Sequence, residues 1–357
     1  MRRGLMAWDE EEIPLEVLRG RVQRLQKAMA QAGQDASILY TNFIRSAAVS
    51  HLTAFSPYWA DGMLLVPKEG EPVFATTLSK RVGSWIQTVK PVGDLVNSPA
   101  PGAVLGKKLA ASGARRVGIL ELDAFPAGLY DDLAAALPGV EIIDASEIFA
   151  LVRSETDEVE RRLLQKGDAM AQSALESLTF NSAMNIGSAV GAVEKHARLK
   201  GAEEVYVAIA PDLDSDRRFL RLSGEGALGR RFALRATVAY KGAWVRHTKT
   251  YSRDEEDSLL LRRAEAWFKI LAASLDDAHR LDAQIADATA SLPGAQLTRW
   301  MAESSVGTRP LSVVASSDKT IPSVKRMPAL ILTVELTVDA MPWCGAGLAG
   351  FAGNAPA

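Results

Sequence analysis

The feature that most constrains the fold is a pair of neighbouring strand patterns in residues 230–252, RRFALRATVAYKGAWVRHTKTYS. A single short turn, with Gly242 in it, separates the two halves of this segment. Strands joined by so few residues have to lie side by side and antiparallel. Any fold for this chain must therefore contain a long hairpin in its second half.

The first half of the chain alternates helical and strand patterns. Leu18, Val22, Leu25 and Met29 recur at helical spacing, and Gly33 is placed to end that helix. The expected strands are 35–40, a hairpin over 62–76, 116–120 and 140–144, and the expected helices between them are 102–113 and 127–137. This alternation predicts an α/β domain with a partly parallel sheet.

The second half predicts an α+β domain, with helices covering a mainly antiparallel sheet. Its expected helices begin near 157, 185 and 255, and its expected strands are 203–210, the pair in 230–252, and 328–338. Ser154-Glu155-Thr156-Asp157 has the pattern of a helix N-cap and lies at the change of pattern. We therefore predict two domains, residues 1–152 and 153–357.

Bulk composition excludes several classes of protein. The 357 residues carry a net charge of -2, with 48% hydrophobic and 24% charged residues, which is typical of a globular protein without a general attraction to nucleic acid or anionic membrane. A basic run over 217–253 has little aromatic interleaving, so a nucleic-acid partner is not expected. No apolar stretch reaches membrane-span length.

Cellular location is predicted from weaker signals. The only cysteine, Cys344, cannot form an internal disulfide or a cysteine-rich zinc site. The N-terminal residues lack the apolar segment of a signal peptide. We expect a cytoplasmic protein, and the abundance of Ala, Arg and Gly indicates a bacterial source.

Several motifs together resemble the creatinase, prolidase and aminopeptidase P family. They are Gly242 followed by Thr248-Lys249-Thr250, the segment HLTAFSPYWADGMLLVP (51–67), and the segment LVRSETDEVERRLLQKGDAM (151–170). The resemblance covers nearly the whole chain in the order of its elements. It implies a creatinase N-terminal-like α/β domain followed by a pita-bread domain.

The same resemblance implies a metal site that this chain does not reproduce. The family holds two metal ions with two aspartates, a histidine and two glutamates, and Arg235 and Arg246 stand where the aspartates belong. The histidine would fall in SSVGTR (304–309), which has none, and Glu335 matches the first glutamate. After Glu335 the only acid is Asp339, and GAGLAGFAGNAPA resembles a truncated last strand. A guanidinium offers a cation no lone pair, so we predict no metal and no cofactor.

The metal-free chemistry of creatinase is also not reproduced. The family's acid/base histidine would lie at about Arg218, and an arginine cannot exchange a proton near neutral pH. The resemblance places Arg218, Arg235, Arg246 and Glu335 in one cavity. Such a cavity suits a small anion, such as a carboxylate or phosphate. Alternatively the charges form a structural ion network, or a one-residue register slip turns an arginine to solvent.

Three further residues are candidates for the site. His247 could act as a base, although a strand residue next to Arg246 points to the opposite face. Tyr58 and Trp59, after Phe55, could form an aromatic lip over the ligand, or they could pack in the core.

These observations favour a non-catalytic or repurposed relative of the family that binds a small anionic ligand. We expect it to form a homodimer, or a heteromer with an active family member. The alternative is a metal-independent hydrolase of a C–N bond in a carboxylated or guanidino substrate, with Glu335 orienting the substrate and His247 as the base. A third interpretation is a protein-interaction module.

Overall fold

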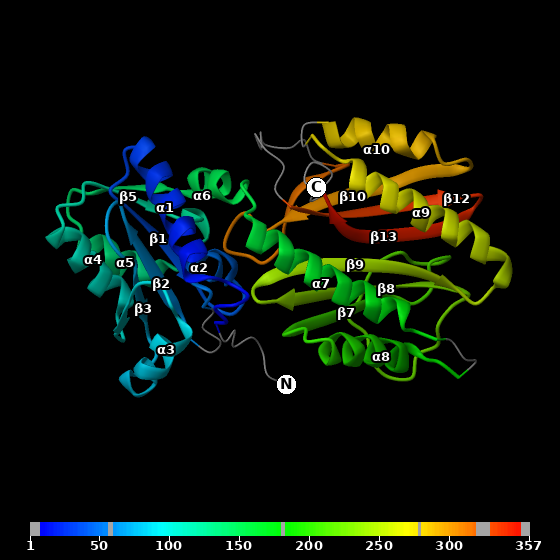
Figure 1. The fold of residues 1–357 in the computed structure, drawn as a ribbon, viewed down its shortest axis with the longest axis horizontal. Helices are drawn as coiled ribbons and strands as arrows, with labels where there is room; N and C mark the ends of the chain where they lie inside the picture. The colour runs from blue at the N-terminus through cyan, green and yellow to red at the C-terminus, as the bar shows by residue number, and fades with distance from the viewer. Residues whose placement is uncertain (1–7, 56–59, 180–182, 278–279, 319–328, 351–357) are drawn as a thin grey trace. The chain divides into compact units, whose positions relative to one another are not determined.

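The computed structural model describes residues 8–55, 60–179, 183–277, 280–318 and 329–350. It forms two compact units (Figure 1). The first unit takes in the described residues up to Arg153 together with Ser305–Ser312, and the second takes in the remaining described residues. The predicted second domain, 153–357, therefore contains one segment that packs within the first unit.

The first unit is built on a mixed six-stranded sheet in the order β4-β3-β2-β1-β5-β6. Its strands are β1 (Ala36–Thr41), β2 (Gly62–Pro67), β3 (Val73–Thr76), β4 (Asp94–Asn97), β5 (Arg116–Ile119) and β6 (Glu141–Asp144). Its α-helices are α1 (Leu15–Gln31), α2 (Ala47–Thr53), α3 (Gly83–Val89), α4 (Pro101–Ala111), α5 (Ala127–Ala135) and α6 (Ser146–Arg153). β1 pairs antiparallel with β2 and parallel with β5, which confirms the predicted α/β domain.

Hydrophobic periodicity accounts for these elements. Leu18, Val22, Leu25 and Met29 are all buried, so the apolar stripe of α1 packs inward as predicted. Every residue of β1 is buried, as expected of a central strand covered on both faces. Gly33, just after α1, has a φ of 67°, which a residue with a side chain rarely adopts.

Residues 305–312 complete the first unit. The Ala47 main-chain N–H donates to the Thr308 carbonyl at 2.9 Å, and the Thr308 N–H donates to the Glu121 carboxylate at 3.0 Å. Arg153 Nε donates to the Ser305 carbonyl at 2.7 Å. A segment distant in sequence is thus joined to three separate places of the first unit.

The second unit is a seven-stranded sheet in the order β11-β10-β12-β13-β9-β8-β7. Its strands are β7 (Glu204–Ala210), β8 (Arg231–Tyr240), β9 (Ala243–Ser252), β10 (Ala295–Ser304), β11 (Ser312–Ser316), β12 (Leu330–Val338) and β13 (Met341–Ala349). Its α-helices are α7 (Glu158–Glu176), α8 (Ile186–Leu199), α9 (Ser258–Ser274) and α10 (Leu281–Ala290). The pairings from β7 to β9 and from β13 to β10 are antiparallel, and the helices pack on the strands (Figure 1), which confirms the predicted α+β architecture.

Local signals predicted in the second unit are present. Asp157 caps α7 by accepting the Glu160 N–H at 2.9 Å, and Asp254 accepts the Glu256 N–H at 3.0 Å. Between β8 and β9, Lys241 and Gly242 have φ values of 47° and 80°. Two residues with positive φ are typical of a tight hairpin turn whose twist matches the strands.

Some elements differ from the prediction. The last strand is not truncated, because Met341–Ala349 forms nine residues that pair with β12 along their whole length. The sequence patterns did not predict α2, α3, β4, α6, β10 or β11. Most of these elements are short, and β10 mixes polar and apolar residues without a clear period.

The two halves of the second sheet meet where β9 pairs with β13 at Thr248 and Ala346. Beside this pair, the Thr250 hydroxyl donates to the Cys344 carbonyl at 2.8 Å and accepts the Cys344 N–H at 2.9 Å. Thr250 is 1% exposed, so water cannot replace these bonds. At this junction the Thr250 side chain therefore takes the place of the backbone hydrogen bonds that would join the two strands.

We predict that Thr250→Val destabilises the protein by about 2 kcal/mol, because it leaves a buried N–H and a buried carbonyl unpaired. Urea unfolding measures this loss. Thr289→Val is the matched control, since the Thr289 hydroxyl is also buried but donates only within its own helix, to Ile285 at 2.7 Å. Equal losses in the two variants would show that Thr250 has no special role.

Candidate functional site

The two arginines predicted to replace metal ligands lie on one face of the sheet. Arg235 stands opposite Thr248, and Arg246 stands opposite Thr237. Residues directly opposite each other on antiparallel strands project to the same side. The register therefore turns both guanidinium groups to the face opposite α7 and α9, which we call the inner face.

Glu335 belongs to the same face. It stands opposite Cys344 on β13 and opposite Arg299 on β10. The pairing of Thr248 with Ala346 connects this register to that of β8 and β9. The structure thus brings Arg235, Arg246 and Glu335 together on the inner face.

Arg246 is engaged in an ion pair. Its Nη1 contacts the Glu303 carboxylate, and its Nε donates to Thr237 Oγ1 at 3.2 Å. The Glu303 side chain is 7% exposed, so the pair is largely removed from water. Sequence reasoning missed Glu303, which lies on the unpredicted strand β10. Its negative charge across the sheet from the half-buried Arg246 could have identified it only after β10 was known.

Arg235 has a different environment. Its guanidinium lies over the Phe219 ring at 3.9 Å from the ring centroid, and its Nε donates to Thr248 Oγ1 at 3.3 Å. Within the described parts of the chain, it makes no ion pair with a carboxylate. Burial, and to a lesser extent the neighbouring Arg246, lower the pKa of Arg235 to about 10. The group remains a cation at neutral pH, held mainly by a ring and a hydroxyl.

A cavity of about 580 Å³ opens beside Arg235. Its lining comes from the loop between β7 and β8 and from the inner-face strands. The lining residues are Asp216, Arg217, Arg218, Phe219, Leu220, Arg235, Arg299, Trp300, Met301, Thr333 and Glu335. Arg246, which contacts Glu303 and Thr237, is not among them.

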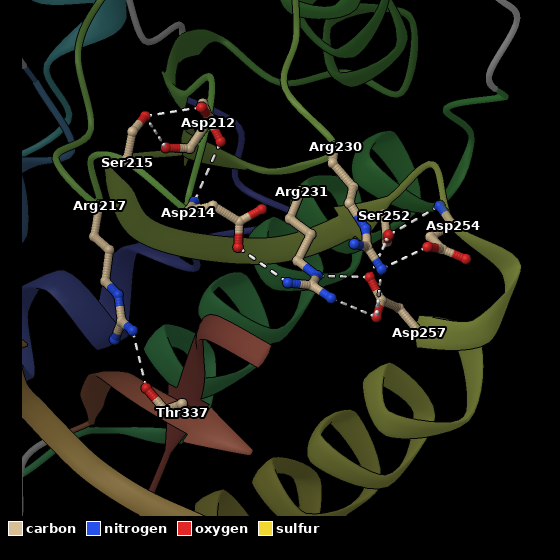
Figure 2. A network of polar contacts seen from close by, with 10 residues as sticks. All are labelled: Asp212, Asp214, Ser215, Arg217, Arg230, Arg231, Ser252, Asp254, Asp257 and Thr337. Carbon is tan, nitrogen blue, oxygen red and sulfur yellow. Dashed lines mark hydrogen bonds and ion pairs between the residues drawn. The ribbon is translucent and has the colours of Figure 1, made fainter. Parts of the chain in front are cut away.

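The loop that forms one wall is held by two contacts on the N-terminal side of Phe219 (Figure 2). Asp214 pairs with Arg231 of β8 at 3.0 Å, and Arg217 Nη2 donates to Thr337 Oγ1 of β12 at 2.9 Å. Arg231 also binds Asp257 at 2.6 Å, and its hydrogen bond holds the pKa of Asp257 below its usual range. These contacts span the inner face and hold Phe219 against Arg235.

Arg218 lies at the rim of the cavity. Its side chain is 81% exposed, and its Nη2 pairs with Asp216 at 2.8 Å. Its charge is therefore already matched and in contact with solvent. Arg217 and Arg299 line the cavity as well, and the sequence analysis did not place either of them there.

His247 points away from Glu335. It stands next to Arg246 on β9, and alternation turns it to the helix-covered face, where its Nδ1 lies 3.3 Å from Asp168 of α7. The structure does not bring His247 and Glu335 into one site. Tyr58 and Trp59, the predicted aromatic lip, lie outside the described residues.

Comparison with known proteins supports the predicted resemblance. Residues 21–154 match the Creatinase/Prolidase N-terminal domain. No curated protein matches the chain in sequence. The first unit therefore contains a segment that matches the N-terminal domain of creatinase and prolidase.

Solved structures share that fold over both units. The Xaa-Pro dipeptidase from Bacillus anthracis matches with a TM-score of 0.65 at 15% identity, covering 93% of each chain. The prolidase from Pyrococcus horikoshii OT3 matches with 0.66 at 15%, covering 92% of this chain and 94% of its own. The X-Pro aminopeptidase from Thermotoga maritima MSB8 matches with 0.67 at 14%, covering 92% and 93%. The second unit therefore has the predicted pita-bread fold.

The residues on the inner face do not fit a pair of metal ions. The described residues contain no group of three or more His, Cys, Asp or Glu side chains that could hold one. Glu303 is paired with Arg246, and Glu335 lies on the face that also carries Arg235. A metal ion there would meet two guanidinium groups beside these two carboxylates, which is too few oxygen ligands for a pair of metal ions.

We predict that Arg246→Met and Glu303→Gln each destabilise the protein by roughly 3 kcal/mol, because each leaves a buried charge without its partner. The double variant should lose much less than the sum, and a double-mutant cycle by chemical unfolding measures this coupling. The control cycle uses Arg198 and Glu194, a more exposed pair at 3.0 Å, where we expect a coupling of about 0.5 kcal/mol. Equal couplings in the two cycles would contradict the assignment.

Proposed function

We propose that this protein is a non-catalytic or repurposed relative of the creatinase and prolidase class that binds a small anionic ligand. The observation that carries the proposal is Arg235, a cation at the wall of a cavity with no carboxylate paired to it. A guanidinium presents several N–H donors in one plane, which suits a carboxylate or a phosphate. The negative charge of the ligand would balance the positive charge of Arg235.

The charges around the cavity favour an anion. Asp216 neutralises Arg218. Arg217 donates to the hydroxyls of Thr298 and Thr337 and to the Leu336 carbonyl, none of which carries a charge. Arg299 lies 3.9 Å from Asp318, which does not line the cavity. Apart from the pair of Asp216 and Arg218, the described lining therefore carries three cations, Arg217, Arg235 and Arg299, and the single carboxylate of Glu335. The excess positive charge attracts an anionic ligand, while Glu335 can accept a hydrogen bond from it.

The ion pair of Arg246 with Glu303 would take the place on the sheet where the family resemblance puts metal ligands. A homodimer, or a heteromer with an active relative, remains part of the proposal, as does a cytoplasmic location. No helix in the described residues is long and apolar enough to cross a membrane.

The alternative, a metal-independent hydrolase, retains Glu335 at the cavity. With His247 on the other face, it needs a different base or a water molecule activated by Glu335. Turnover of a carboxylated or guanidino substrate that disappears in Glu335→Gln would favour this alternative over the binding protein.

We predict saturable binding of inorganic phosphate or succinate to the purified protein by isothermal titration calorimetry. Arg235→Met should weaken the binding by at least about tenfold, since it removes a charge-assisted contact. Arg262→Met is the matched control, because Arg262 is an exposed residue of α9 outside the cavity.

Two outcomes would contradict the anion site. One is the absence of saturable binding by folded wild-type protein for both anions. The other is an equal loss of affinity in the Arg235 and Arg262 variants, which would indicate a general charge effect.

We also predict that the purified protein retains only substoichiometric Mn, Co or Zn after dialysis, as measured by elemental analysis. The physical reason is the repulsion between a divalent cation and the guanidinium of Arg235. Two equivalents of metal per chain together with release of Xaa-Pro products would overturn both this prediction and the proposed function.

A further inference from the structure

A second cavity, of about 350 Å³, lies on the other face of the second sheet, between α7 and α9. Its floor is β9 and β13. The cavity does not share its walls with the anion site, because successive residues of β9 point to opposite faces. Thus Arg246 projects to the inner face, whereas His247 and Lys249 project into this groove between the helices.

Two glycines of β13 place no side chains on the floor of this cavity. A Cβ at Gly345 would lie 2.2 Å from the Trp343 ring, so the indole lies directly across that glycine. A Cβ at Gly347 would lie 3.4 Å from ring atoms of His247 and Phe268. The rings of Trp343, His247 and Phe268 therefore lie over the glycine backbone, and the space above these rings remains open.

The charges on the floor of this groove are paired, whereas Glu176 and Lys269 line it from exposed positions on the helices. His247 meets Asp168 of α7 at 3.3 Å, and Lys249 meets Glu265 of α9 at 3.0 Å. All four side chains are between one fifth and one third exposed. A charged group on the floor would have to separate one of these two pairs. The floor of the groove therefore selects against net charge, unlike the cavity beside Arg235.

The side chains of the groove can nevertheless form hydrogen bonds with a ligand. An ammonium has three N–H donors, and Glu265 accepts one from Lys249. The carboxylates of Asp168 and Glu265 each have further lone pairs that can accept from a ligand. The remaining walls are largely apolar, from Leu175, Phe268, Ala272, Ala273, Trp343 and Leu348.

From these observations we infer that the groove between α7 and α9 is a binding site for a small neutral molecule with a flat apolar body and an amide-like polar group. The apolar body lies over the glycine floor between the helices. The polar group accepts a hydrogen bond from Lys249 and donates one to Glu265 or Asp168. A cavity of this size and a mainly apolar lining with a few convergent polar groups are typical of small-molecule sites. This site is independent of the proposed anion site.

The test is binding of 2-naphthamide to the full chain, measured by equilibrium dialysis or ligand-observed NMR. We expect one saturable site per chain. Ala273→Phe, an exposed position of α9 that lines the groove, should weaken binding by at least about tenfold by filling the space. Ala266→Phe is the matched control, because Ala266 is an exposed alanine of the same helix that does not line the groove.

A second pair of measurements separates this site from the anion site. Arg235→Met should leave 2-naphthamide binding unchanged, and 2-naphthoate, which carries a charge in place of the amide, should bind at least about tenfold more weakly.

The inference is overturned by any of four results: no saturable binding to folded wild-type protein, equal losses in the two α9 variants, equal affinity for the amide and the carboxylate, or an affinity that falls as protein concentration rises. The last result would mean that a second copy of the chain occupies the groove.

Discussion

The second unit has to hold two guanidinium groups, those of Arg235 and Arg246, on the inner face of its antiparallel sheet. Removing a charge from water costs free energy unless a partner compensates for it. Arg246 is compensated by Glu303 across the sheet, whereas the contacts of Arg235 within the described residues are the Phe219 ring and the Thr248 hydroxyl. The proposed anion site rests on this difference between the two arginines.

The two faces of one strand, β9, are chemically distinct. On β9, Arg246 and Thr248 contribute to the inner face, and His247 and Lys249 contribute to the groove under the helices. The inner cavity has a cation in excess, while every charge that lines the floor of the groove has a partner. Strand alternation therefore separates the proposed anion site from the proposed site for neutral molecules.

Much of the fold could be predicted from the sequence, because long periodic elements dominate both units. The α1 stripe, the α7 cap and the β8–β9 hairpin each carry a local signal, and the hairpin register could be read from its short turn. Glu303 could not be found in this way, since its partner Arg246 is distant in sequence and β10 lacks a clear alternation. The same holds for Thr250, whose bonds to Cys344 depend on which strands become neighbours.

The segment 305–312 has a consequence for how the protein is made. It supplies the first unit with the Thr308 carbonyl that receives the Ala47 N–H, and with the donors that bind Glu121. On the ribosome, a domain usually folds as its own residues emerge. Here the first 153 residues have emerged long before residue 308 has been added. The first unit therefore reaches its final form only after most of the second has also been translated.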